Sequence, residues 1–190
     1  MPYIQNALSF TIEILVGLFL IAVILRFLCQ LCRVDFRNPI CQAIVTLTNP
    51  PLKILRRFIP GLFGIDLASV VLIILVSCIK FGALILISGH PIQLPGLILF
   101  SIGKALNTAI WILIIATIVR SLASWFPQAS HHPVIHLLAS LTEPLLAPVR
   151  RLLPDLGGLD LSPIIVIIIL NIVQQLAAYP IIDLAVAMMM

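Results

Sequence analysis

Three charged side chains stand inside long apolar stretches of this sequence, where they could bind an ion or pass on a proton. They are Glu13, Lys80 and Lys104. An unpaired charge surrounded by lipid costs at least about 2.5–3.5 kcal/mol, so we expect Glu13 to pair with one of the lysines. The group fits a polar pathway for an ion or proton, or an internal tie that fixes how helices pack, and we favour the tie.

A second motif places two adjacent arginines shortly before an aspartate, and it occurs twice. The first copy contains Arg56, Arg57 and Asp66, and the second contains Arg150, Arg151, Gly158 and Asp160. A guanidinium group offers paired donors that fit a carboxylate or a phosphate. We therefore expect one arginine to bind Asp160 and the other a lipid phosphate, with substrate binding as the alternative. Because both aspartates precede an apolar run, we also expect each to cap a helix.

The remaining polar residues supply no complete catalytic or metal-binding set. Cys29 and Cys32 form a CxxC pair, but no second pair accompanies it, so we interpret both as small apolar residues. His131, His132 and His136 have no cysteine or carboxylate close by, which makes a metal site the weaker interpretation. No nucleophile–base set, P-loop or dinucleotide fingerprint is present. We expect a chain that is not an enzyme and needs no cofactor.

The segments that must position these groups are strongly apolar. Of the 190 residues, 62% are hydrophobic and only 9% are charged, whereas a soluble domain carries about 25% charged residues. So few charges could not cover a water-exposed surface, and lipid is the expected solvent. The basic residues flank the apolar segments and form no polar stripe, which argues against nucleic-acid binding.

Four segments are long and apolar enough to cross a bilayer. They run approximately over residues 8–31, 67–88, 97–122 and 161–179. Backbone polar groups in lipid must bond to one another, so each segment is expected to be a helix. The first run is longer than a signal-peptide core and lacks a small-residue cleavage pattern, and we therefore keep it as a spanning helix.

A shift of 94 residues aligns the second half of the chain with the first without a gap. Residues that rarely match by chance agree in register: Arg26 with Arg120, Thr48 with Thr142, Pro50 with Pro144, Arg56 with Arg150, and Asp66 with Asp160. The same shift aligns Glu13 with Asn107 and Lys80 with Gln174. We call the intramembrane polar residues the polar layer: Glu13, Lys80, Lys104, Asn107, Asn171 and Gln174. The duplication predicts an all-α membrane protein with two parallel two-helix repeats, 1–94 and 95–190.

A long basic loop joins the two spans of each repeat, at 32–66 and at 123–160. Apolar residues recur there at helical spacing, and Pro50, Pro51 and Pro144 should break the helix. Each loop is expected to be a broken amphipathic helix in the membrane interface, with a re-entrant hairpin as the alternative. Lysine and arginine concentrate in both loops, which predicts cytoplasmic loops and outer termini. Arg26 and Arg120 are expected to snorkel toward the headgroups.

The repeated Arg-Arg-x-x-Pro and Gly-x-Asp stretches, with the turns at Asn49-Pro50 and Glu143-Pro144, resemble the YggT family of small bacterial membrane proteins. The resemblance covers nearly the whole chain, although in the first copy Phe63 replaces a glycine and Ala68-Ser69 replaces Ser-Pro. It implies a multi-pass protein of the bacterial inner membrane linked to osmotic or potassium-related ion homeostasis. Plastid relatives are linked to cytochrome-complex assembly and organelle organisation. The resemblance implies no catalytic residues.

Two functional classes are compatible with these features. One is a transport-related component of ion or osmotic homeostasis that uses the polar layer. The other is a scaffold or assembly factor that docks partners on the amphipathic loops. We expect contact with the bilayer and with anionic lipid headgroups, and no nucleic acid. Because four spans make a small transporter, we also expect a second copy or another membrane protein as partner.

Overall fold

The computed structural model describes residues 2–61, 66–126, 128, 132–153 and 160–189, and within those ranges the chain forms helices and short connections. The long helices are α1 (Pro2–Leu31), α3 (Leu67–Ile87), α4 (Leu94–Ala123), and a final helix made of α6 (Ser162–Val173), η2 (Gln174–Ala178) and α7 (Tyr179–Met189). These are the four helices long and apolar enough to cross a membrane. The prediction of an all-α protein with four spans is confirmed.

Two spans are longer than the sequence pattern indicated. The first helix begins at Pro2 rather than near residue 8, and the last continues to Met189 rather than ending at Tyr179. Pro180 does not end the last helix because a π-helical turn precedes it, in which the Tyr179 N–H donates to the Gln174 carbonyl. The wider turn gives the proline ring room in a helix that it would otherwise interrupt.

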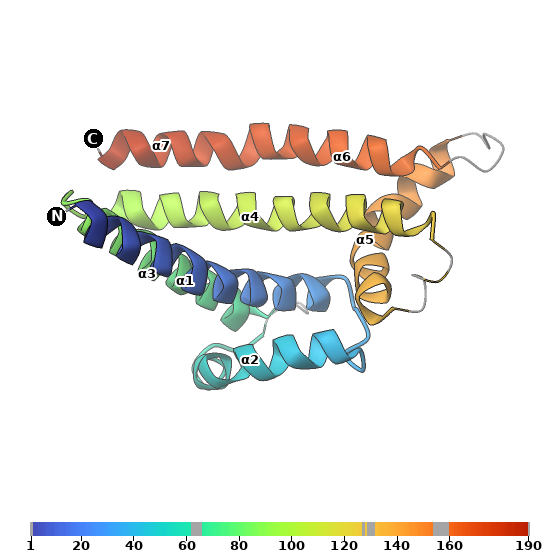
Figure 1. Ribbon diagram of the computed structural model, residues 1–190, viewed down its shortest axis with the longest axis horizontal. Helices are drawn as coiled ribbons and strands as arrows, with labels where there is room; N and C mark the ends of the chain where they lie inside the picture. Colours follow the sequence, from blue (N-terminus) through green and yellow to red (C-terminus); the bar gives the residue numbers. More distant parts are fainter. Residues whose placement is uncertain (1, 62–65, 127, 129–131, 154–159, 190) are drawn as a thin grey trace.

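The part of the last helix that extends beyond Tyr179 packs tightly against α4. A Cβ atom at Gly103 would lie 2.7 Å from Cγ1 of Ile182, and one at Gly96 would lie 2.5 Å from Cγ of Met189. The two glycines therefore let α7 approach α4 more closely than any larger residue could. Figure 1 shows α4 lying between the α6–α7 helix and the pair formed by α1 and α3.

The two repeats follow the same order of span, amphipathic helix and span. Both chain ends lie at one end of the bundle, and α5 (Pro133–Leu152) crosses the opposite end (Figure 1). Helix α2 (Pro39–Leu55) packs against α1 and α3. The repeats share a core, since Ala105, Leu137 and Leu141 of the second pack into the buried cluster of the first.

The prediction that prolines break the amphipathic helices is wrong. Helix α2 continues through Pro50 and Pro51, and α5 continues through Pro144 and Pro148. A proline removes one backbone donor and bends a helix, but it ends the helix only if the freed carbonyls find no other partner or solvent. Figure 1 shows α2 and α5 as continuous, bent ribbons.

Candidate functional site

A buried arginine near the end of α1 holds α2 in place. The Arg26 side chain is only 5% exposed. Its NH1 group donates to Thr48 Oγ1 at 2.8 Å and to the Val45 carbonyl at 3.1 Å, and its NH2 group donates to Asn49 Oδ1 at 3.0 Å. A guanidinium can be buried only when such acceptors replace water. We call this set of bonds the arginine clamp.

The second repeat contains the same clamp at positions shifted by 94 residues. Arg120 NH1 donates to Thr142 Oγ1 at 2.9 Å and to the Ala139 carbonyl at 3.1 Å, and its NH2 donates to Glu143 Oε2 at 2.5 Å. The expectation that Arg26 and Arg120 snorkel toward the headgroups is therefore wrong. Each turns inward because the neighbouring amphipathic helix presents three acceptors at the depth of the guanidinium.

The threonine of each clamp is oriented by its own helix. Thr48 Oγ1 donates to the Ile44 carbonyl at 2.7 Å, and Thr142 Oγ1 donates to the Leu138 carbonyl at 2.7 Å. This back-bonding uses the hydroxyl hydrogen, so the lone pairs remain free to accept from arginine. Sequence reasoning aligned these threonines across the repeat but assigned them no role. Their identity in register was the signal that could have found them.

The repeated arginine–aspartate motif forms an ion pair in each repeat. Arg56 donates to Asp66 Oδ2 from Nε at 3.2 Å and from NH2 at 2.5 Å. Arg150 donates to Asp160 Oδ2 from the same atoms at 3.1 and 3.0 Å. The pair is more deeply buried in the first repeat, where the Asp66 side chain is 7% exposed against 42% for Asp160.

The other members of the motif have different surroundings. Arg57 and Arg151 are exposed, and no ion pair among the described residues includes either of them. Gly158 lies outside the described residues. The first arginine of each pair therefore binds the aspartate, and the second faces the surroundings of the protein.

The two aspartates cap their helices differently. Asp160 Oδ1 accepts from the Ser162 backbone N–H at 2.9 Å, in keeping with the expected capping role. Asp66 occupies the N-cap position, but its carboxylate accepts from Ser69 Oγ at 2.7 Å rather than from a backbone N–H. The capping prediction is therefore wrong for the Asp66 side chain, which accepts no hydrogen bond from the backbone at the start of α3.

Electrostatics keep these carboxylates charged. Burial raises the pKa of Asp66, but hydrogen bonds from Arg56 and Ser69 and the charge of Arg56 outweigh it, and the net pKa is below its ordinary value. For Asp160, burial is likewise outweighed, first by Ser162 and then by Arg150, so its pKa is also lowered. The hydrogen bond from Arg120 is the main cause of the lowered pKa of Glu143.

Glu143 connects the clamp of the second repeat to the arginine–aspartate pair. Its Oε2 accepts from Arg120, and its Oε1 accepts from Arg150 NH1 at 3.3 Å. Arg120, Glu143, Arg150 and Asp160 thus form one alternating chain of charges. The first repeat has Asn49 at the position of Glu143, so its clamp and its ion pair are not joined by a carboxylate.

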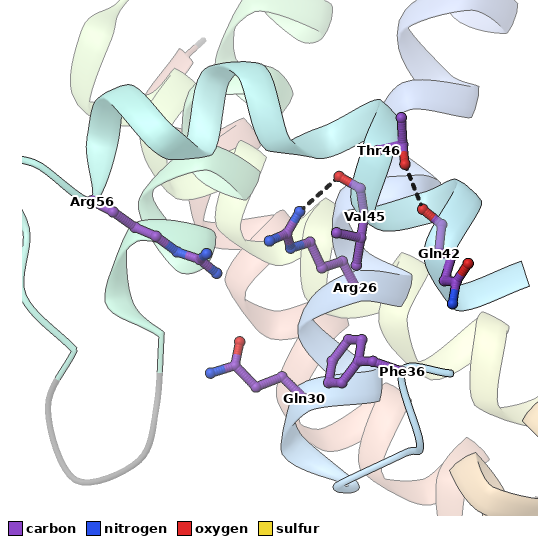
Figure 2. A pocket seen from close by; sticks show the side chains of 7 residues that line it. All are labelled: Arg26, Gln30, Phe36, Gln42, Val45, Thr46 and Arg56. Atoms are coloured by element: carbon purple, nitrogen blue, oxygen red, sulfur yellow. Dashed lines mark hydrogen bonds between the residues drawn. The ribbon is translucent and has the colours of Figure 1, made fainter. Parts of the chain in front are cut away.

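A cavity of about 580 Å³ opens between the clamp and the ion pair of the first repeat. Figure 2 shows the guanidinium groups of Arg26 and Arg56 pointing into this space from different sides, with the Gln30 amide beside them. Its lining consists of Arg26, Gln30, Phe36, Gln42, Val45, Thr46 and Arg56. The cavity is therefore polar and carries positive charge, although it begins at the edge of a membrane span.

The polar layer of the spans separates into two groups. Gln174 is 2% exposed and its Nε2 donates to Asn107 Oδ1 at 2.6 Å, which ties the π-helical turn η2 to α4. Asn171 instead donates to the Ile167 carbonyl of its own helix at 2.8 Å. Gln174 and Asn107 therefore form a packing tie within the second repeat.

The charged members of the polar layer do not pair as expected. The Lys80 and Lys104 amines lie 5.5 and 5.3 Å from the ring centres of Phe81 and Phe100, and these two rings pack edge to face. Glu13 is exposed on the outer face of α1, and no ion pair among the described residues includes it. The lysines therefore contact aromatic rings, which attract cations electrostatically.

Comparison with known proteins places this repeated architecture in a family. The family model CCB3/YggT matches the chain twice, over residues 5–87 and 99–181, which confirms the internal repeat. An uncharacterized protein of Pseudomonas aeruginosa is 39% identical over 175 residues, covering 91% of this chain and 89% of the relative. An uncharacterized protein of Vibrio alginolyticus is 39% identical over 170 residues, covering 86% and 89%.

A third relative carries the family name in its description. "Uncharacterized protein YggT" of Escherichia coli K12 is 34% identical over 182 residues, covering 90% of this chain and 89% of the relative. No solved structure matches the chain. The bacterial relatives are similar over most of their length, and the four apolar helices make this chain a multi-pass membrane protein. The chain belongs to the CCB3/YggT family.

Proposed function

We propose that this chain is a non-enzymatic membrane scaffold that holds α2 and α5 as a docking surface at the cytoplasmic face of the bacterial inner membrane. The observation that carries the proposal is the repeated arginine clamp. Arg26 and Arg120 each donate three hydrogen bonds to the neighbouring amphipathic helix. A helix that only rested on the lipid surface would not need a buried guanidinium to fix its position.

The two amphipathic helices are also joined to each other. Asn38 Nδ2, just before α2, donates to the Pro133 carbonyl at the start of α5 at 2.7 Å. Cys32 Sγ, just after α1, lies 3.5 Å from the Leu141 carbonyl of α5. These contacts make α2 and α5 parts of one surface, which supports a docking role over two independent lipid anchors.

The chemistry of that surface indicates its partner. Ile54 on α2 is 66% exposed, and Lys53 and Arg57 next to it carry positive charge. At the end of α5, the exposed Leu152 follows the exposed Arg151. Exposed apolar groups rimmed by cations fit anionic headgroups or the acidic and apolar surface of another membrane protein. We propose the membrane protein as the functional partner, with lipid headgroups covering the rest.

Site-specific crosslinking in living bacteria tests the docking surface. A photo-crosslinking residue at Ile54 should capture one protein of defined mass, whereas the same residue at Ile79, on the exposed side of α3, should capture lipid. Arg26→Met should abolish the Ile54 product and Arg120→Met should not. If Ile54 gives only lipid adducts, or if its product ignores the loss of the clamp, the scaffold proposal is wrong.

The orientation of the surface has its own test. In a cysteine-free background, a cysteine at Gln5 or Gln93 should react with an impermeant thiol reagent in intact cells. A cysteine at Arg37 or His132 should react only after the membrane is permeabilised, because the basic loops are expected inside. The opposite pattern would place the docking surface outside the cell.

Ion or osmotic homeostasis is the second candidate function. The observation that favours it is the pair of lysine amines, Lys80 and Lys104, held inside membrane spans beside aromatic rings. Ionisable residues at such depth often mark an ion path. Ion flux into liposomes containing the purified chain, altered by Lys80→Met or Lys104→Met, would support this function. Flux equal to that of empty liposomes leaves the scaffold as the better account.

A further inference from the structure

In the second repeat a glutamate links two arginines, and no described residue of the first repeat links the equivalent pair. In the second repeat the two oxygens of Glu143 accept from Arg120 and from Arg150 NH1. The equivalent residue of the first repeat is Asn49, whose Oδ1 accepts from Arg26 at 3.0 Å. Among the described residues, NH1 of Arg56 has no hydrogen-bond acceptor.

The missing bond follows from the chemistry of the amide. A carboxylate has two accepting oxygens, whereas asparagine has one, and its Nδ2 is a donor that cannot accept from a guanidinium. Asparagine is also shorter than glutamate by one methylene group. Asn49 can therefore satisfy Arg26 but cannot bridge from Arg26 to Arg56.

A cavity of about 580 Å³ lies between the two arginines, and both Arg26 and Arg56 line it. Figure 2 shows Arg26 and Arg56 pointing into it, and Gln30 and Gln42 add amide groups to its lining. Its volume is within the range of about 300–1,000 Å³ that is usual for small-molecule sites. Two guanidinium groups beside a single carboxylate, Asp66, leave the cavity with a net positive charge.

We propose that the first repeat binds an external phosphate group between Arg26 and Arg56, where it gives NH1 of Arg56 the acceptor that Glu143 Oε1 gives Arg150 in the second repeat. Phosphate oxygens accept from NH1 of Arg56 and from the Nε–H of Arg26, and the Gln30 amide donates to a remaining oxygen. A lipid headgroup and free phosphate share this chemistry. The cavity exceeds the size of a bare ion and lies beside the end of a span, so a lipid headgroup is the expected source.

Asn49→Glu tests the proposal because it supplies the internal carboxylate that the second repeat already has. Asn49→Gln is the matched control, with the same side-chain length and no charge. The full-length chain is placed in phosphatidylcholine nanodiscs, and its Tm is measured during titration with inorganic phosphate at constant ionic strength. A second series adds phosphatidic acid to the discs and contains no free phosphate.

Wild type and Asn49→Gln should be stabilised saturably in at least one series. Asn49→Glu should bind about 10-fold more weakly or worse, because its carboxylate competes for the same charged donors. Gln30→Glu places a carboxylate on another wall of the cavity and should have the same effect without altering α2. A response to phosphatidic acid alone identifies a headgroup, and a response to free phosphate alone identifies a soluble ligand.

Two results would overturn the site. One is the absence of any saturable response of the wild type in both series. The other is a response of Asn49→Glu and Gln30→Glu equal to that of the wild type. The site is independent of the docking proposal, since crosslinking at Ile54 can fail while phosphate binding remains, and the reverse can also occur.

Discussion

Replacing Arg26 by methionine should loosen α2 without unfolding the spans. The variant keeps an unbranched side chain but loses three hydrogen bonds to α2. Hydrogen bonds to a charged group contribute about 1.5–3 kcal/mol each, and removing a buried charge recovers several kcal/mol of desolvation. Thr48 keeps its bond to the Ile44 carbonyl, so it is not left without a partner. The net cost to α2 is about 2–4 kcal/mol.

Hydrogen exchange measured by mass spectrometry in nanodiscs can read this cost helix by helix. A loss of about 2–4 kcal/mol lowers amide protection roughly 30- to 700-fold when opening is local. In Arg26→Met the α2 amides should exchange faster and those of α5 should not. Arg120→Met should give the mirror result.

The exposed Arg37 supplies the control, because its side chain makes no hydrogen bond or ion pair among the described residues. Arg37→Met should leave both helices at wild-type protection. If α2 keeps its wild-type protection in Arg26→Met, the clamp does not hold α2. If α2 and α5 loosen together in either clamp variant, the two clamps do not act on separate helices.

Asp66→Asn should destabilise the protein by about 2–3 kcal/mol and Asp160→Asn by about 0.5–1 kcal/mol. The difference is expected because only the Asp66 carboxylate is deeply buried. Equal shifts in Tm for the two variants would contradict this. The folded-state pKa values of Asp66, Glu143 and Asp160 are lowered. Their contribution is therefore present above about pH 4 and is lost as the pH falls through the folded values, so Tm should drop in acid and drop less in Asp66→Asn. Gly103→Ala should cost about 1–3 kcal/mol and Gly82→Ala less than about 1 kcal/mol, because the added Cβ meets Ile182 at 2.7 Å in the first and Leu97 at 3.4 Å in the second. Stability is measured by unfolding in mixed micelles. Similar losses for Gly103→Ala and Gly82→Ala would show that α7 can move away from α4.

The number, kind and order of the helices could be predicted because each depends on local properties of the chain. Long apolar runs must be helical in lipid, and the gapless shift of 94 residues shows that the same unit occurs twice. The spacing of Arg150 and Asp160 likewise placed an arginine beside an aspartate. Local rules were less reliable at prolines. The last span was expected to end at about residue 179, and a break was expected at Pro50; a π-helical turn and a continuous helix are found there instead.

The direction of each buried polar side chain was decided by tertiary structure. Arg26 follows the pattern of a snorkelling residue, and only the position of α2 gives it better partners than lipid headgroups. The expected pairing of Glu13 with a lysine required α1 to turn that residue inward, and packing turned it outward. Apolar burial is set by composition and periodicity along one helix, whereas a hydrogen bond between helices depends on their relative rotation and depth. Those two quantities arise only when all the helices pack together.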